Sequence, residues 1–224
     1  MDASNSTRPH MVVAVDGPSG SGKSSISKKS AEKLGLSFLD TGAMYRALTW
    51  FCLKNNLVDE EKIHPKLIKE NFDIWISIDP TVEKVLVNKD DVTRTIREDV
   101  VTTNVSKYAA MAKVREFLVK KQRELVGLSG HRIVVEGRDI GSVVLPNADF
   151  KIYITASDEA RAKRRAIQTN TDEKSVLEAQ KIRDSLDTNR SVSPLVIPKN
   201  AIMLDNSDLD FDQSVDRFIQ IVRA

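Results

Sequence analysis

Near the start of the chain, a glycine-rich motif fits the pattern G-x-x-x-x-G-K-S/T of a phosphate-binding loop. It consists of Gly17, Pro18, Ser19, Gly20, Ser21, Gly22, Lys23 and Ser24. The apolar run 11–16 before it predicts a buried strand, and the residues from Ser25 to Gly35 predict a helix. Glycines let backbone N–H groups point at a phosphate, with the positive end of the helix behind them. We therefore expect Lys23 to contact the β- and γ-phosphates of a nucleotide and Ser24 to bind Mg²⁺.

The composition argues against several classes of protein. A chain of 224 residues suits one domain with insertions, and its net charge of +2 argues against a surface that coats nucleic acid. The single cysteine, Cys52, cannot form an internal disulfide, and we expect it in the core. One cysteine and three histidines argue against a Cys/His metal site. The start is short and polar and no apolar run is long, so we expect a cytoplasmic protein without membrane partners. We also expect a monomer without nucleic-acid partners.

Short apolar runs alternate with helical patterns along the chain. Strands are predicted at 11–16, 37–39, 132–136, 151–155 and 201–204. This alternation around an N-terminal phosphate-binding loop predicts an α/β fold with a doubly wound, mainly parallel, five-stranded sheet. Ligands are expected at the carboxyl ends of the strands.

Capping residues and apolar stripes predict where the helices begin and end. We expect Thr41 to cap a helix over 43–53. A strong amphipathic pattern predicts a helix over 110–126 that ends at Gly127, and the apolar stripe of the closing helix includes Phe211. Further helices are expected after the capping residues Ser157, Asp172 (or Thr171) and Asp210 (or Asp208).

The pattern changes between residues 72 and 93. Residues 72–78 and 84–87 alternate apolar and polar and are separated by turn residues, which predicts a small antiparallel meander inserted among βα units. Residues 88–91 match N-K-x-D, a sequence with which GTPases read guanine. No D-x-x-G motif stands between the phosphate-binding loop and this point, so an ordinary turn is the favoured interpretation.

Charged residues at strand and helix ends are further candidates for a site. Glu136 ends a predicted strand, where phosphate-loop proteins hold Mg²⁺ through water; a solvated carboxylate is the alternative. Arg46 could clamp an anion or be a solvated helix charge. Helical spacing places Arg161, Arg164 and Arg165 on one face, with no acidic partner one turn later. It likewise places Arg183, Asp187 and Arg190 on one face of the next predicted helix. The alternatives are a solvated basic face for the first set and helix-stabilising pairing of Arg183 with Asp187 for the second.

Four stretches together resemble the bacterial cytidylate kinase family: 17–24, 40–46, 136–141 and 183–190. The resemblance extends from about Val12 to the C-terminus, with the stretches in the order and at the spacing of the family. It implies a kinase, a phosphotransferase with a phosphate group as acceptor, that transfers the γ-phosphate of ATP to CMP or dCMP with Mg²⁺.

The resemblance also divides the chain into regions. The core would comprise 11–40 with the phosphate-binding loop, 132–156 and 173–224. Residues 41–131 would form a nucleoside-monophosphate-binding region that includes the 72–93 insertion. A disordered tail (1–10) and a short helical lid (157–172) complete the division.

Individual roles carried over from the family follow its motifs. ATP would be bound by the loop 17–24 together with Ser25, and Mg²⁺ by Ser24 and, through water, by Glu136. The cytosine edge would be read by Thr41, Ser106, Arg115 and Asp139. The acceptor phosphate would be held by Arg46, Arg138 and Arg190, and the sugar hydroxyls by Arg183 and Asp187. The transferring phosphoryl group would be stabilised by Lys23, Arg138, Arg190 and at least one of the lid residues Arg161, Arg164 and Arg165.

Two other functions use the same phosphate-binding loop. One is a GTP-dependent switch that reads guanine through residues 88–91. The other is a kinase of a small non-nucleotide acceptor, which leaves the many arginines on the acceptor side unexplained. A nucleic-acid-binding module is disfavoured by the near-neutral charge and the few aromatic residues.

Overall fold

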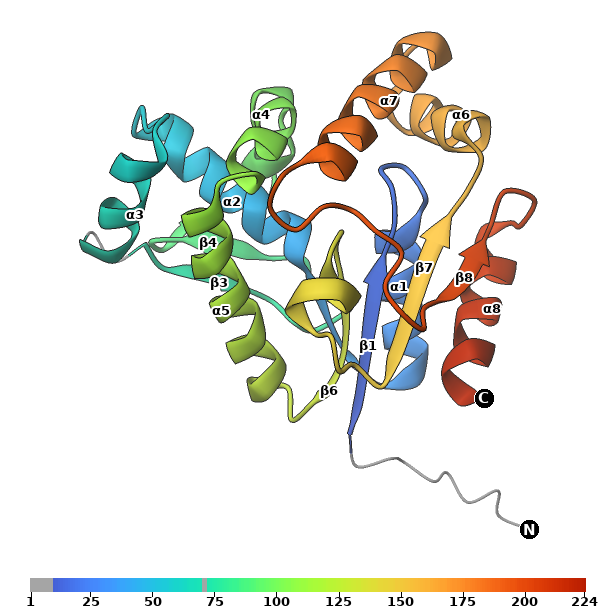
Figure 1. Cartoon of the computed structure of the whole chain (residues 1–224). Helices are drawn as coiled ribbons and strands as arrows, with labels where there is room; N and C mark the ends of the chain where they lie inside the picture. Colours follow the sequence, from blue (N-terminus) through green and yellow to red (C-terminus); the bar gives the residue numbers. More distant parts are fainter. Residues whose placement is uncertain (1–9, 70–71) are drawn as a thin grey trace.

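The computed structural model of the chain describes residues 10–69 and 72–224, so the predicted tail lies outside the described residues except for His10. Five strands form the central sheet, in the order β2-β6-β1-β7-β8 (Figure 1). All four pairings are parallel, which confirms the predicted doubly wound α/β fold. The strands are β1 (Met11–Asp16), β2 (Ser37–Asp40), β6 (Arg132–Glu136), β7 (Phe150–Thr155) and β8 (Ile202–Asp205).

Helices cover both faces of this sheet because its central strand is apolar on both sides. Val13 and Val15 of β1 pack with side chains of α1 (Lys23–Leu34) and α8 (Phe211–Arg223). Val12 and Ala14 point to the opposite face and belong to the cluster that contains α2 (Thr41–Lys54) and α5 (Ala112–Leu128). The remaining helical elements are α3 (Glu60–Lys69), the 3₁₀ turn η1 (Thr95–Arg97), α4 (Asp99–Ala109), the π-helical turn η2 (Ile140–Val144), α6 (Asp158–Thr169) and α7 (Glu173–Asn189).

None of the helices in the described ranges combines the length and the apolar character that spanning a membrane requires. Cys52 is buried in the core, as predicted.

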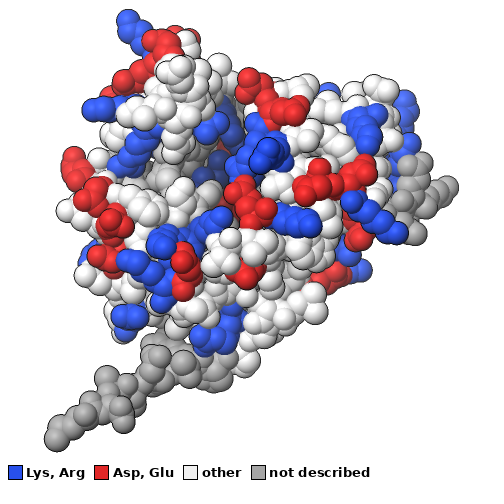
Figure 2. All heavy atoms as spheres, turned by 180° about the vertical axis from the view of Figure 1, so that it is seen from behind, with Lys and Arg blue, Asp and Glu red and all other residues white. Residues whose placement is uncertain are grey.

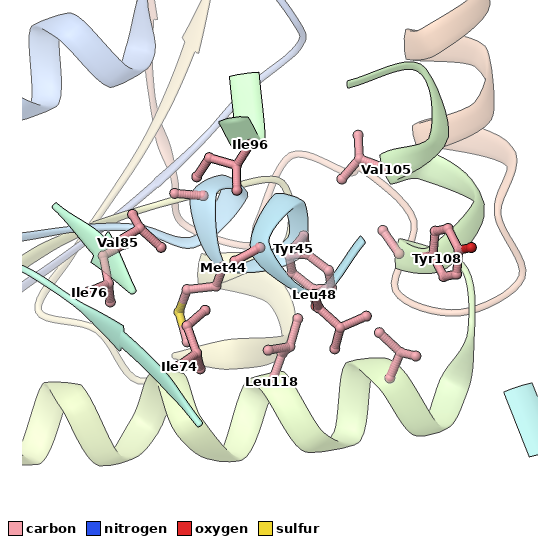
Figure 3. Close-up of a cluster of buried hydrophobic side chains, with 14 of the residues drawn as sticks. Met44, Tyr45, Leu48, Ile74, Ile76, Val85, Ile96, Val105, Tyr108 and Leu118 are labelled. Carbon is pink, nitrogen blue, oxygen red and sulfur yellow. The ribbon is translucent and has the colours of Figure 1, made fainter. Parts of the chain in front are cut away.

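The predicted meander is a three-stranded antiparallel sheet. Its strands are β3 (Ile74–Ile76), β4 (Val85–Val87) and β5 (Asp90–Asp91), in that order. Ile74 and Ile76 are buried in the same cluster as Met44 of α2, and Figure 3 shows Ile74 beside Met44. Asn88 and Lys89 have φ angles of 49° and 76°, so these residues of the N-K-x-D match form the turn between β4 and β5. The turn interpretation of residues 88–91 is confirmed.

Asp40, not Thr41, caps helix α2. The Asp40 carboxylate accepts a hydrogen bond of 2.9 Å from the Ala43 N–H, and Thr41 is already helical. The buried Thr41 hydroxyl instead donates to the Glu136 carbonyl, at 2.7 Å. The prediction was wrong because both residues are good caps, and the extended backbone at the end of β2 leaves Asp40 in the capping position.

The helical prediction over 110–126 was only partly right. Helix α4 precedes it and was not predicted, since its Val, Thr and Asn residues are weak helix formers and burial of Val101 and Tyr108 holds it in place. Helix α5 continues through Gly127, and the chain turns at Gly130, whose φ is +65°. Phe211 is 48% exposed at the first position of α8 and is therefore not part of the core.

Candidate active site

The phosphate-binding loop joins the carboxyl end of β1 to α1. Helix α1 begins at Lys23 rather than at Ser25, so its first N–H groups belong to the motif itself. Gly20 has a φ of +75°, and a Cβ there would lie 2.3 Å from Nε2 of the Gln180 side chain. This geometry requires glycine and curls the backbone in front of the helix N-terminus, as binding of a phosphate requires.

Lys23 and Glu136 form a buried pair at the mouth of this loop. Lys23 Nζ lies 3.6 Å from Glu136 Oε1 and donates a 3.0 Å hydrogen bond to the Pro18 carbonyl. Burial and the positive charge of Arg138 lower the pKa of Lys23, whereas Glu136 opposes the shift. Burial also raises the pKa of Glu136, against the attraction of Lys23. A negatively charged phosphate would therefore gain from this partly compensated lysine.

A magnesium ligand set fits the same place. Glu136 Oε2 is buried and has no hydrogen-bond partner, and carboxylate oxygens are ligands that Mg²⁺ prefers. Ser24, the residue that follows Lys23, is exposed at the start of α1. No three His, Cys, Asp or Glu side chains within the described residues gather as a metal-binding cluster, so an ion here would keep several water ligands.

Arg46 and Asp40 pair next to this mouth. Arg46 Nη2 lies 3.0 Å from Asp40 Oδ2, with both side chains mostly buried. Although burial opposes it, Arg46 and the Ala43 N–H hold the pKa of Asp40 below its usual range. The pair lies at the end of β2, next to the end of β6 where Glu136 stands.

Asp139 holds two arginines from distant parts of the chain. The Arg115 guanidinium donates to Asp139 Oδ2, and Arg190 Nη2 lies 3.7 Å from Asp139 Oδ1. All three side chains are at least nine-tenths buried. The Arg115 guanidinium carbon also lies 5.3 Å from the centre of the Tyr45 ring. Burial and Arg115 lower the pKa of Arg190, which indicates a surplus of positive charge at this point.

Asp187 pairs with Arg138, not with Arg183. Arg138 Nε donates a 3.0 Å hydrogen bond to Asp187 Oδ2. Arg183 Nε is buried without a partner, and burial and Arg138 lower the pKa of Arg183 to about 10. The alternative of an Arg183–Asp187 pair is therefore wrong.

The three arginines of α6 have different surroundings. Arg161 is buried and donates to Asp158, Asp184 and the Ser19 carbonyl of the phosphate-binding loop. Its acidic partners come from the preceding turn of α6 and from α7. The prediction from helical spacing had looked for a partner only in the following turn. Arg164 donates to the carbonyls of Asn206 and Leu209, and Arg165 is exposed. Asp184 also accepts a hydrogen bond from the Ser19 N–H, which ties α7 to the loop.

The site therefore gathers basic groups from both halves of the chain. Arg46 and Arg115 pair with Asp40 and Asp139, and Arg138 and Arg190 pair with Asp187 and Asp139. Figure 2 shows a hollow in the surface with Lys and Arg side chains around and within it. Ser106 lies half-buried on α4, and Ser25 is exposed on α1.

Comparison with known proteins identifies the family. The family model for cytidylate kinase matches residues 13–224. A cytidylate kinase from Caldanaerobacter subterraneus subsp. tengcongensis is 44% identical over 218 residues, which cover 94% of each chain. A cytidylate kinase from Rhodococcus opacus is 46% identical over 95% of this chain and 94% of its own. The chain belongs to the cytidylate kinase family.

Two further similarities cover only part of the other protein or have low sequence identity. A bifunctional pantoate ligase/cytidylate kinase from Prochlorococcus marinus is 43% identical over 95% of this chain but only 42% of its own. An uncharacterized protein from Eubacterium ventriosum has a TM-score of 0.52 at 14% identity and covers 96% of this chain and 99% of its own. The second similarity shows the fold alone.

Three carboxylates of the site were not predicted from the sequence: two of them bind arginines and the third binds backbone N–H groups. Asp16, Asp40 and Asp184 accept hydrogen bonds within the site. Asp16 ends β1 and Asp40 ends β2, the two strands of the parallel sheet that flank β6, at the edge where ligands bind. Their positions at the ends of predicted strands are a signal that is visible in the sequence. Asp184 sits in the middle of α7, and nothing local distinguishes it from a solvated helix residue.

Proposed function

We propose that the protein transfers the γ-phosphate of ATP to CMP or dCMP, with Mg²⁺. The observation that supports this proposal is the buried Lys23–Glu136 pair, with the mostly buried Arg138 two residues beyond Glu136 at the carboxyl end of β6. Two phosphates bound on either side of Lys23 would meet end to end, which in-line phosphoryl transfer requires.

ATP would be bound mainly by backbone groups. The N–H groups of the loop and of the first turn of α1 would hold the phosphates, with Lys23 neutralising the charge that develops on the transferring group. The hydroxyls of Ser24 and Ser25 would complete the donor site. Bound Mg²⁺, held by Ser24 and through water by Glu136, would supply further neutralisation of the phosphate oxygens.

The acceptor would be bound mainly by side chains. We assign the acceptor phosphate to Arg46, Arg138 and Arg190, the sugar hydroxyls to Arg183 and Asp187, and the cytosine edge to Thr41, Ser106, Arg115 and Asp139. Guanidinium groups suit this task because their planar forks can bind a phosphate through two hydrogen bonds. We also assign residues 41–131 as the acceptor-binding region.

A general base is not needed for this reaction, because the acceptor phosphate is itself a nucleophile at neutral pH. Exclusion of water is needed, since ATP would otherwise be hydrolysed. We infer that 157–172 acts as a lid. The contact of Arg161 with the Ser19 carbonyl supports a role for Arg161 near the transferring group, together with Arg164 or Arg165.

A panel of acceptors tests the proposal. ADP formation from ATP is measured with CMP, dCMP, UMP, AMP and GMP at equal concentrations. We expect CMP and dCMP to be the best acceptors. Rates with AMP or GMP that equal or exceed those with CMP would contradict the assignment of the base-reading residues. The acceptor-phosphate site would still stand if the rates with these acceptors fell when Arg46, Arg138 or Arg190 was replaced.

A further inference from the structure

Asp16 links the donor side of the site to the acceptor side. It is the last residue of β1, is fully buried, and immediately precedes Gly17, the first residue of the phosphate-binding loop. Its two carboxylate oxygens accept hydrogen bonds from the N–H groups of Ile140, at 2.7 Å, and Gly141, at 2.8 Å. One side chain thus joins the start of the loop to the turn that follows Arg138 and Asp139.

The turn that Asp16 binds has an unusual backbone. It opens the π-helical element η2, and Asp139 before it has φ and ψ of −142° and 27°. The first N–H groups of a helical turn have no partner within the turn, so a buried turn needs an acceptor from elsewhere. Asp16 supplies both acceptors. A Cβ at Gly141 would lie 3.3 Å from Asp16 Oδ2 and 3.0 Å from Pro198 Cγ, so the contact is close on both sides.

The side chains that flank this turn belong to the proposed acceptor site. Arg138 pairs with Asp187, and Asp139 pairs with Arg115 and Arg190. Their positions follow from the backbone that Asp16 holds. We propose that Asp16 is a positioning residue that fixes the 138–141 turn relative to the phosphate-binding loop and so aligns the acceptor with the donor phosphate. This inference rests on the proposed function.

The chemistry of a carboxylate explains why Asp stands here. Both of its oxygens accept hydrogen bonds, whereas the amide of Asn offers one acceptor and one donor. In the Asp16→Asn variant, one of the two N–H groups would face an NH₂ group and lose its partner. A buried N–H without a partner is costly, so the turn would shift rather than keep its geometry.

Kinetics of the Asp16→Asn variant test the proposal, with Asp149→Asn as the matched control. Asp149 Oδ2 accepts a 2.8 Å hydrogen bond from the Val12 N–H, at the opposite end of β1, so both variants lose a carboxylate bound to backbone. We expect kcat/KM for CMP to fall about tenfold to a hundredfold in Asp16→Asn. The KM for ATP should change less than about threefold, because the loop keeps its glycines and Lys23. Asp149→Asn should retain the wild-type values for both substrates.

Three results would overturn the proposal: equal losses for ATP and CMP, an unchanged kcat/KM for CMP, or the same selective loss in Asp149→Asn. Should Asp16→Asn fail to fold, Gly141→Ala provides the second variant, since its methyl group would press on the same carboxylate. It should show the same loss confined to CMP, and a loss shared with ATP would again contradict the proposal.

Amide hydrogen exchange gives a readout that does not depend on activity. In Asp16→Asn, the N–H groups of Ile140 and Gly141 should exchange faster, while those at the start of α1 should keep their wild-type rates. Unchanged exchange at 140 and 141 would overturn the positioning role even if activity fell. A wild-type protein that fails to phosphorylate CMP would instead contradict the proposed function and leave this structural test decisive for Asp16.

Discussion

The two halves of the candidate site are built from different parts of the polypeptide. The proposed donor half is a continuous stretch, 17–24, in which backbone N–H groups and glycine geometry would do most of the binding. The proposed acceptor half uses side chains from β2, α2, α5, α7 and the turn between β6 and η2, and neighbouring carboxylates bind its guanidinium groups. A phosphate chain common to all nucleoside triphosphates can be held by backbone alone, whereas recognition of one monophosphate needs specific side chains.

The ion pairs of the acceptor half also differ from ordinary surface pairs. Arg115 and Asp139 are nearly fully buried, whereas the Arg97–Glu83 pair is about half exposed. Removing one partner of a buried pair leaves an uncompensated charge, which is strongly destabilising, while an exposed pair contributes little. We expect substitutions in the donor half to lower the rate with every acceptor, and substitutions in the acceptor half to lower the rate selectively.

The largest effect is expected for Lys23→Met. Loss of the buried cation that we propose faces the transferring phosphoryl group should lower kcat by about a thousandfold with every acceptor. Initial rates with CMP and dCMP measure this. Lys28→Met is the control, since Lys28 is on the same helix and its exposed side chain lies 4.0 Å from Glu83. Activity of Lys23→Met within tenfold of wild type would contradict the donor half.

A selective effect is expected for Asp139→Asn. The change frees Arg115 and Arg190 from their shared carboxylate, and kcat/KM for CMP should fall about a hundredfold with little change in the KM for ATP. Asp90→Asn is the control because Asp90 pairs with Lys54 on the surface, at 3.1 Å. An equal rise in the KM for ATP would show that the two halves are not separable at this residue.

The contribution of Asp16, which links the two halves, to the unfolding free energy should depend on pH. Burial raises the pKa of Asp16 to about 7; the Gly141 and Ile140 N–H groups oppose this, Asp139 raises it and Arg138 lowers it. A carboxyl group whose pKa is raised in the folded state stabilises that state at low pH, and this contribution is lost as the pH rises through the folded-state pKa. Between about pH 5 and about pH 7.5, wild type should therefore lose about 2 kcal/mol of unfolding free energy relative to Asp16→Asn.

Urea denaturation of both proteins at the two pH values measures this difference. Asp149→Asn serves as the reference for a carboxylate bound to backbone elsewhere on β1. A pH-independent difference between wild type and Asp16→Asn would mean that Asp16 keeps an ordinary pKa.

The smallest effect is expected for Arg46→Lys. Lysine keeps the charge beside Asp40 but loses the planar fork, so the KM for CMP should rise about tenfold while kcat with saturating CMP changes little. The control is Arg97→Lys, which alters the exposed pair with Glu83. An unchanged KM for CMP would place the acceptor phosphate away from Arg46 and narrow the acceptor half to Arg138 and Arg190.

Local patterns in the sequence determined the donor half and the general fold. The five strands, the loop at 17–24, the small antiparallel sheet and the turn at 88–91 were all predicted, because periodicity, glycine and capping chemistry act over a few residues. One of the errors was also local. Thr41 and Asp40 are both good caps, and only the end of β2 decides between them.

The tertiary structure alone decided how the charges of the acceptor half are paired. From helical spacing, a pair one turn apart between Arg183 and Asp187 was one of the interpretations. The partner of Asp187 is instead Arg138, from the turn after β6. Arg161 similarly reaches the carbonyl of Ser19, 142 residues earlier in the chain. Electrostatic pairing depends on distance and burial rather than on sequence separation, so these partners are settled only when the sheet brings the ends of β1, β2 and β6 to one edge.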